Sequence, residues 1–229
     1  MTLCGQAWGA SCLVVRESPG RAVRYRALNG VSSMILLSAA VLSLVLPARR
    51  PLAPIASSEV GITSGCNQAF CLALMSLARA GDQVILPRPH YFNHDMWMRM
   101  QGVEPVSLDF RPGSGAVPDA EDAAKLIGPR TRAIVLISPN NPTGAVYPRA
   151  TIHAFYELAK QRGIALLLDE TYKDFLPEGE RPHDLFADPS WRGTLVHLYS
   201  FSKVFALTGY RVGGITTGAA MMSEIEKAM

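Results

Sequence analysis

Residues 133–144 read Ala-Ile-Val-Leu-Ile-Ser-Pro-Asn-Asn-Pro-Thr-Gly, and residues 164–172 read Ile-Ala-Leu-Leu-Leu-Asp-Glu-Thr-Tyr. In both stretches an unbroken apolar run is followed at once by polar residues. Apolar runs without alternation are typical of strands that are buried on both faces of a parallel sheet. Ligands of such sheets bind beyond the carboxyl ends of the strands. The polar residues that follow these runs are therefore the first candidates for function.

Strand-like and helix-like segments alternate along the chain from Glu59 onward. This alternation predicts an α/β fold with three layers, in which helices cover both faces of a mainly parallel, seven-stranded sheet. The strands are expected at Val60–Thr63, Gln83–Pro87, Val103–Leu108, Ala133–Ile137, Ala165–Leu168, Leu195–Tyr199 and Val212–Thr216, and the helices at Asn67–Arg79, Asn93–Gln101, Asp119–Ile127 and Ala150–Arg162.

The charge of this 229-residue chain is unevenly distributed, and the break lies near residue 58. Residues 1–58 contain six arginines and one glutamate, a net charge of +5, whereas the remainder carries −2 and the whole chain +3. A nucleic-acid-binding domain would spread lysine and arginine over a folded face, so this pattern argues against nucleic acid as a partner. We therefore expect an atypical N-terminal segment, 1–58, followed by one main domain, 59–229.

An apolar run, Val31–Leu46, stands out within the N-terminal segment. It is close to the lower length limit for a membrane-spanning helix, and four serines dilute it. Three interpretations stay open: a packed apolar helix, a membrane or signal segment, and a segment foreign to the domain behind it. The four cysteines form no Cys-x-x-Cys motif, which argues against zinc and favours reduced thiols in a cytoplasmic protein. A membrane location is the minority alternative.

Several of the polar residues that follow strands suit a phosphate group. A glycine at a strand-to-helix turn lets the free amides of the first helical turn face an anion. The turn has neither the G-x-G-x-x-G nor the G-x-x-x-x-G-K-[ST] pattern, which argues against NAD and P-loop sites. Hydroxyl and guanidinium groups follow a later strand and suit the same anion. The candidates are Gly65, Cys66, Asn67, Ser200, Ser202 and Arg211.

Four further residues that follow strands are also candidates for function. Tyr91 can offer its ring for stacking, and Asn141 can both donate and accept hydrogen bonds. Asp169 ends a buried strand, where a carboxylate needs a cation or strong donors, such as a protonated ring nitrogen. Lys203 follows a buried strand, and a partly desolvated lysine can lose its proton and form a Schiff base.

Together, the strings Ser-Pro-Asn-Asn-Pro-Thr-Gly, Asp-Glu-x-Tyr and Ser-Phe-Ser-Lys, with Arg211 eight residues after Lys203, resemble the class I/II aminotransferases. These are fold type I enzymes that use pyridoxal 5′-phosphate, and the resemblance runs from about Glu59 to the end. It implies a transaminase in which Lys203 holds the cofactor as a Schiff base and then moves a proton between the substrate α-carbon and C4′. It also implies that Asp169 keeps the pyridine nitrogen protonated.

The resemblance assigns the other candidates to the same cofactor. Tyr91 would stack on its ring, while Asn141 and Tyr172 would donate to its phenolic oxygen. The phosphate would lie among Gly65, Cys66, Asn67, Ser200, Ser202 and Arg211, and no metal is implied. The implied substrates are an amino acid and a 2-oxo acid, and the implied assembly is a homodimer.

The chain departs from the family pattern at both ends. Residues 1–58 match nothing in it, and the family continues past Met229 into a small domain whose arginine binds the substrate carboxylate. We therefore expect a truncated enzyme with impaired activity. Two alternatives remain open: a carbon–sulfur β-lyase of the same fold, and a non-catalytic cofactor-binding fragment.

Histidines receive no catalytic role at this point. His90 and His94 flank Tyr91 and are interpreted as structural, and the alternative is that one of them faces the substrate. Residues 181–184, which include His183, are interpreted as a solvated loop.

Overall fold

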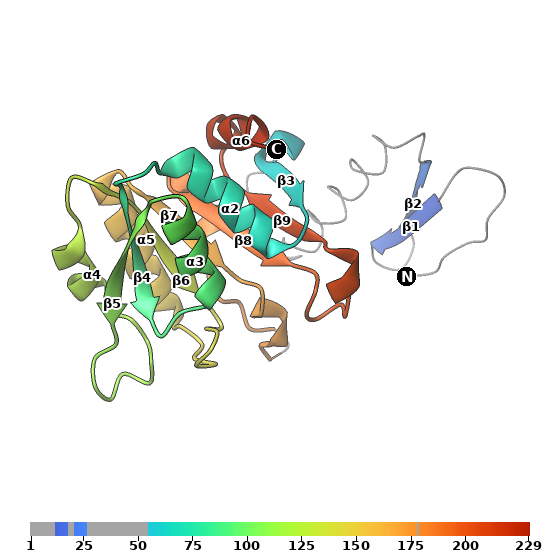
Figure 1. The fold of residues 1–229 in the computed structure, drawn as a ribbon. Coiled ribbons are helices and arrows are strands. Elements are labelled where there is room, and N and C mark those ends of the chain that lie inside the picture. Colours follow the sequence, from blue (N-terminus) through green and yellow to red (C-terminus); the bar gives the residue numbers. More distant parts are fainter. Residues whose placement is uncertain (1–11, 18–20, 27–54, 178) are drawn as a thin grey trace.

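The structure is a computed structural model that describes residues 12–17, 21–26, 55–177 and 179–229 (Figure 1). Its elements alternate as strand and helix through most of the described chain. The strands are β1 (Cys12–Glu17), β2 (Arg21–Arg26), β3 (Val60–Thr63), β4 (Gln83–Arg88), β5 (Glu104–Asp109), β6 (Thr131–Ile137), β7 (Ala165–Asp169), β8 (Leu195–Ser200) and β9 (Gly213–Thr216), and the helices are α2 (Cys66–Leu77), α3 (Phe92–Met100), α4 (Ala120–Leu126), α5 (Arg149–Arg162) and α6 (Ala219–Glu226).

Strands β3 to β9 form one sheet in the order β3-β9-β8-β7-β6-β4-β5. The pairs β4–β5, β4–β6, β6–β7 and β7–β8 are parallel, whereas β9 runs antiparallel to both β3 and β8. All seven predicted strands are present, and each end lies within two residues of its predicted position. The predicted α/β class with a mainly parallel seven-stranded sheet is therefore confirmed.

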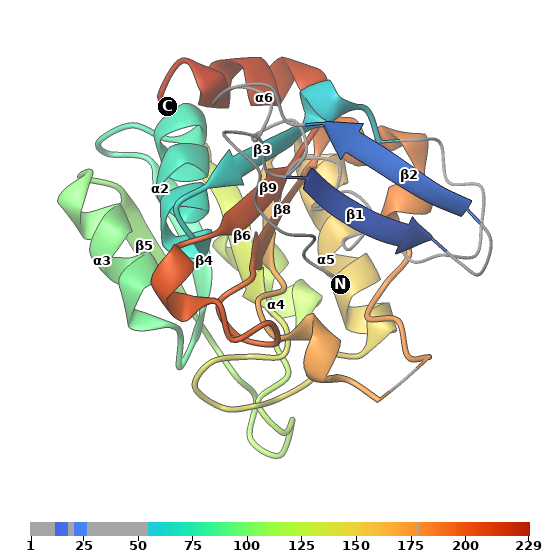
Figure 2. The ribbon, with the colours of Figure 1, turned by 90° about the vertical axis from the view of Figure 1, so that its right-hand side faces the viewer.

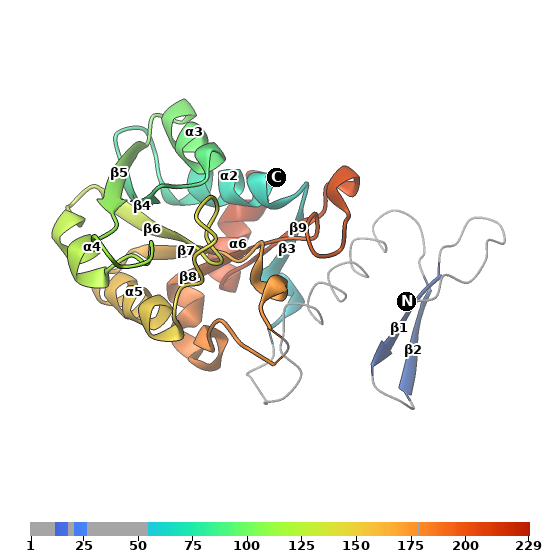
Figure 3. The same ribbon diagram turned by 90° about the horizontal axis from the view of Figure 1, so that it is seen from below.

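Helices cover both faces of this sheet (Figures 2 and 3). Helices α4 and α5 pack into one hydrophobic core, and α2, α3 and α6 pack into a second core on the opposite face. Strand β7 contributes to both, since Leu166 and Leu168 join the core with Phe155 of α5, while Leu167 joins the core with Phe70 of α2. All five residues of β7 are buried, as its unbroken apolar sequence predicts.

Local sequence signals explain where several helices begin and end. Asp119 caps α4, since its carboxylate accepts hydrogen bonds from the amides of Glu121 (2.8 Å) and Asp122 (3.2 Å). Gly163 ends α5 in the left-handed conformation at φ +63°, where glycine is favoured. The sequence analysis predicted four helices and omitted α6, whose eight residues pack Met222 and Ile225 into the core.

The N-terminal part holds a feature that was not expected. Strands β1 and β2 pair antiparallel as a separate two-stranded sheet, with Cys12 opposite Arg26 and Glu17 opposite Arg21. The apolar run 31–46 lies outside the described residues. Within the part of the chain that the structure describes, no helix is both long and apolar enough to cross a membrane. The boundary at residue 58 stays a prediction.

Candidate functional site

A pocket lies at the edge of the sheet where the parallel strands β4, β6, β7 and β8 end. It contains about 620 Å³ of space including its open mouth. Ten of the eleven predicted site residues line it, and Gly65 adjoins it. The lining residues are Cys66, Asn67, Tyr91, Ile137, Asn141, Asp169, Thr171, Tyr172, Ser200, Ser202, Lys203, Thr208 and Arg211.

One end of the pocket is formed where the start of α2 meets the start of β9. Gly65 precedes α2 at φ +79°, and no side chain caps that helix end. A Cβ atom on Gly65 would overlap the guanidinium of Arg211. A Cβ atom on Gly213 would lie 2.5 Å from the carbonyl carbon of Gly65 and 2.7 Å from the amide nitrogen of Cys66. Both glycines are therefore needed to bring the helix amides and Arg211 together.

The loop after β8 holds Arg211 in place. Arg211 Nη1 donates hydrogen bonds to Ser202 Oγ (3.4 Å) and to the carbonyl of Thr208 (3.2 Å). Thr208 Oγ1 in turn donates to the carbonyl of Ser202 (2.8 Å), and the amide of Ser202 donates to Ser200 Oγ (3.2 Å). This end of the pocket thus combines a guanidinium, two serine hydroxyls and the amides of a helix start, a set that suits a phosphate.

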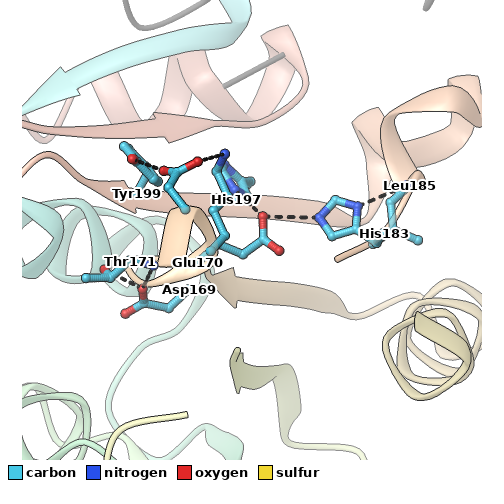
Figure 4. Close-up of polar contacts among 9 residues, drawn as sticks. Asp169, Glu170, Thr171, His183, Leu185, His197 and Tyr199 are labelled. Carbon is cyan, nitrogen blue, oxygen red and sulfur yellow. Dashed lines mark hydrogen bonds and ion pairs between the residues drawn. The ribbon is translucent and has the colours of Figure 1, made fainter. Parts of the chain in front are cut away.

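Asp169, the last residue of β7, lies buried within the same pocket. Its Oδ1 accepts hydrogen bonds from the amide (3.0 Å) and the hydroxyl (2.7 Å) of Thr171 (Figure 4). His94 Nε2 lies 3.4 Å from the other oxygen, Oδ2. Burial alone would raise the pKa of Asp169, but the contacts with His94 and Thr171 outweigh burial and lower it. Asp169 is therefore an ionised carboxylate that can hold a cationic donor.

His94 is a site residue that the sequence analysis did not identify. It is 1% exposed, its ring stacks on Phe70 with 3.9 Å between centroids, and it meets the ring of Tyr91 edge-on. The sequence did carry one signal for His94. It comes three residues after Tyr91 at the start of a predicted helix, and residues three apart on a helix lie on the same face. The structural interpretation of His94 is incomplete, since the residue also contacts Asp169.

The thiol of Cys66 lies beside Asp169 in the pocket. Burial raises the pKa of this thiol, and the charge of Asp169 raises it further. The thiol therefore stays protonated at neutral pH and is a poor nucleophile. Cys66 and Cys71 are free thiols in the described part of the chain.

Asn141 comes from the turn after β6, and this turn is braced by its own side chains. Asn140 Nδ2 donates to Thr143 Oγ1 (2.8 Å), which also accepts from the amide of Ala145 (3.2 Å). The amide of Gly144 donates to the carbonyl of Asn140 (2.8 Å). These bonds fix the turn without using the Asn141 side chain, which lines the pocket.

The two predicted tyrosines lie on separate walls of the pocket. Tyr91 directly precedes α3, and its hydroxyl accepts a hydrogen bond from Asn93 (2.9 Å). Tyr172 follows β7, and Lys203 Nζ lies 5.8 Å from the centre of its ring. Lys203 itself is exposed to the pocket, three residues beyond the end of β8.

Behind Asp169 lies a buried polar cluster that the sequence analysis missed (Figure 4). Glu170 Oε2 lies 2.9 Å from Nε2 of His197 and 3.3 Å from Nε2 of His183. Burial would raise the pKa of Glu170, but the two histidines lower it well below its usual range. The interpretation of residues 181–184 as a solvated loop is wrong for His183, which is 8% exposed and accepts a hydrogen bond from the amide of Leu185.

Among the residues that the structure describes, no set of three or more His, Cys, Asp or Glu side chains is placed to hold a metal ion.

A family model described as "Aminotransferase class I and II" matches residues 27–229. The match begins upstream of residue 58, so similarity extends further toward the N-terminus than the motifs indicated.

Individual relatives agree with the family match. An aspartate aminotransferase from Sulfolobus acidocaldarius is 34% identical over 161 residues, which cover 69% of this chain and 40% of that protein. An arginine–pyruvate transaminase from Pseudomonas aeruginosa is 35% identical over 172 residues, which cover 74% of this chain and 43% of that protein. The chain therefore spans about two-fifths of the length of the curated relatives that it matches.

A solved structure supports the fold. N-Succinyldiaminopimelate aminotransferase from Mycobacterium tuberculosis matches with a TM-score of 0.74 at 27% identity, over 84% of this chain and 50% of that chain.

Proposed function

This chain belongs to the class I and II aminotransferases, and from that premise we propose that its pocket binds pyridoxal 5′-phosphate and supports amino-group transfer between an amino acid and a 2-oxo acid. The observation that carries the proposal is the meeting of Lys203 and Asp169 in one pocket. They follow the adjacent strands β8 and β7, so an amine and an ionised carboxylate reach the same ligand from neighbouring positions.

The donor set of the pocket fits this cofactor at both of its charged ends. Arg211, Ser200, Ser202 and the uncapped start of α2 suit the phosphate dianion. Asp169 suits a protonated pyridine nitrogen, because its own pKa is lowered and its carboxylate is buried. The close approach of Gly65 to Arg211 leaves no space for a side chain at position 65, as expected of a cradle for an anion.

When bound, the cofactor supplies an electron sink for the electrons of a broken bond at the substrate α-carbon. Lys203 would hold the cofactor through its Nζ amine. The same amine, once free, would take up and return the proton of the substrate α-carbon. Asp169 would hold the proton on the ring nitrogen.

The remaining residues orient the ring. Tyr91 offers a face for stacking. Asn141 and Tyr172 would donate hydrogen bonds to the phenolic oxygen, and the turn that carries Asn141 is braced by its own hydrogen bonds. Cys66 and Asn67 would contribute backbone amides to the phosphate, whereas the amide of Gly65 donates to the carbonyl of Thr63 (2.8 Å) and Gly65 serves by leaving space for Arg211. The thiol of Cys66 lies toward Asp169 and takes no part in the contact with the phosphate.

Among the described residues, the pocket lining offers no second arginine for a substrate carboxylate. Arg211 is the one arginine among its lining residues, and its bonds to Ser202 and Thr208 tie it to the phosphate end. We therefore expect the substrate carboxylate to be bound by residues outside this set. The 229-residue chain alone should then form the Schiff base but transaminate slowly. The homodimer stays a prediction.

The experiment is an absorption titration of the purified chain with pyridoxal 5′-phosphate. We expect a band above about 400 nm, typical of a lysine Schiff base, in the wild type and in Lys125→Ala, an exposed control. Lys203→Ala should lack the band. A wild type without the band, or a Lys203→Ala variant that retains it, would contradict the proposal. Product analysis separates a transaminase, which yields a new amino acid, from a β-lyase, which yields pyruvate and ammonia.

A further inference from the structure

Thr171 makes an unusual double contact with Asp169. Its backbone amide and its hydroxyl both donate to the same oxygen, Oδ1, at 3.0 and 2.7 Å (Figure 4). The Thr171 side chain is 9% exposed and also lines the pocket.

Because both contacts go to Oδ1, the two carboxylate oxygens of Asp169 differ in how many further hydrogen bonds they can accept. A carboxylate oxygen has two lone pairs, so Oδ1 is fully occupied by Thr171. Oδ2 lies 3.4 Å from His94, the neutral thiol of Cys66 lies close to the same carboxylate, and Oδ2 keeps acceptor capacity on the side of the pocket. A ligand that donates to Asp169 would therefore meet Oδ2.

We infer that Thr171 is a positioning residue: its hydroxyl fixes the Asp169 carboxylate so that Oδ2 accepts the ring N–H of a bound pyridinium. This inference rests on the proposed function. The backbone amide of residue 171 would donate whatever side chain stood there, so the hydroxyl is the part that the sequence Asp-Glu-Thr-Tyr adds. Removing it would free one lone pair of Oδ1 and let the carboxylate turn.

The hydroxyl also affects the charge of Asp169. The titratable groups that face this carboxylate are His94 from α3 and Cys66 from α2, and the thiol of Cys66 stays neutral. A hydrogen bond to a charged group is strong enough to change a carboxyl pKa by about 1. Loss of the Thr171 hydroxyl should therefore raise the pKa of Asp169 even when the pocket is empty.

Three variants separate the hydroxyl from the fold. Thr171→Val removes the hydroxyl and keeps the shape, and Thr171→Ser keeps the hydroxyl. Thr171→Ala serves if the valine variant does not fold. Thr217→Val is the matched control, because Thr217 is also buried and its hydroxyl donates to the carbonyl of Leu195, at 2.9 Å, outside the pocket lining.

The first measurement compares two probes, pyridoxal 5′-phosphate and its 1-deaza analogue, which has carbon in place of the ring nitrogen. Thr171→Val should weaken binding of pyridoxal 5′-phosphate about tenfold and leave binding of the analogue within about twofold of wild type. Thr171→Ser and Thr217→Val should behave as wild type with both probes. If Thr171→Val lost the same affinity for both probes, or lost affinity for neither, the inference would be overturned.

The second measurement needs no cofactor. Carbon-13 NMR of the cofactor-free protein follows the Asp169 carboxyl carbon as the pH is lowered, and Thr171→Val should raise its titration midpoint by about 1 relative to Thr171→Ser. An unchanged midpoint would overturn the inference. If wild type forms no Schiff base, the proposed function fails, and this titration still decides the role of Thr171.

Discussion

Arg211 lays its guanidinium against Gly65, so closely that any side chain at position 65 would overlap it. The two residues come from opposite ends of the domain sequence. Gly65 directly precedes α2 and lies two residues after β3, and Arg211 lies two residues before the neighbouring strand β9. The pairing of β3 with β9 therefore assembles the phosphate end of the pocket from two distant segments.

Gly65→Ala should weaken binding of pyridoxal 5′-phosphate by at least about tenfold, because the new methyl group displaces Arg211 and alanine is disfavoured at φ +79°. The matched control is Gly113→Ala, which has the same φ of +79° and open space around it. Spectral titration with the cofactor measures both. Equal affinities of the two variants would show that the contact with Arg211 is unimportant.

His94→Ala should destabilise the protein at neutral pH by about 1–3 kcal/mol, because buried Asp169 loses a charge-assisted partner. The lowered pKa of Asp169 contributes stability that is present above its ordinary value of 3.8 and is lost as the pH falls through the lower folded value. The difference between variant and wild type should therefore shrink in acid.

Urea unfolding at several pH values measures this difference. His90→Ala is the control, since His90 lies 4.0 Å from the half-buried Asp95 and has no contact with Asp169. A His94→Ala variant with wild-type stability at neutral pH would contradict this assignment.

Glu170→Gln should lower the free energy of unfolding at neutral pH by about 1–3 kcal/mol, because His183 and His197 lose a charged acceptor. The lowered pKa of Glu170 contributes stability above its ordinary value of 4.5, and this contribution disappears as the pH falls through the folded value. The exposed Glu180→Gln is the control. Should both variants unfold at the same urea concentration at neutral pH, the buried cluster contributes no stability.

The sequence predicted the sheet well, because each strand of the domain carries its own signal. The apolar run of β7 is buried at all five positions, and the residue after its leucines lines the pocket. Parallel strands end at one edge, so polar residues that follow separate strands meet without any knowledge of the loops. Ten of the eleven predicted site residues share one pocket for this reason.

The missed features depend on contacts that no local pattern reveals. His94 meets Asp169 only because α3 packs over the end of β7, and His183 is buried only because its loop folds back onto Glu170. Thr171 lies inside the recognised string Asp-Glu-x-Tyr, at its variable position, but its hydroxyl could equally have faced solvent. Helix α6 is short, and packing against the core defines it more than its own sequence pattern does.

The most direct test of the account is to reduce the cofactor-loaded protein with borohydride and locate the attached pyridoxyl group by peptide mass spectrometry. The chain has five lysines, Lys125, Lys160, Lys173, Lys203 and Lys227. The account predicts attachment at Lys203 alone, with about one group per chain. Attachment spread over the other lysines, or no attachment at Lys203, would contradict it.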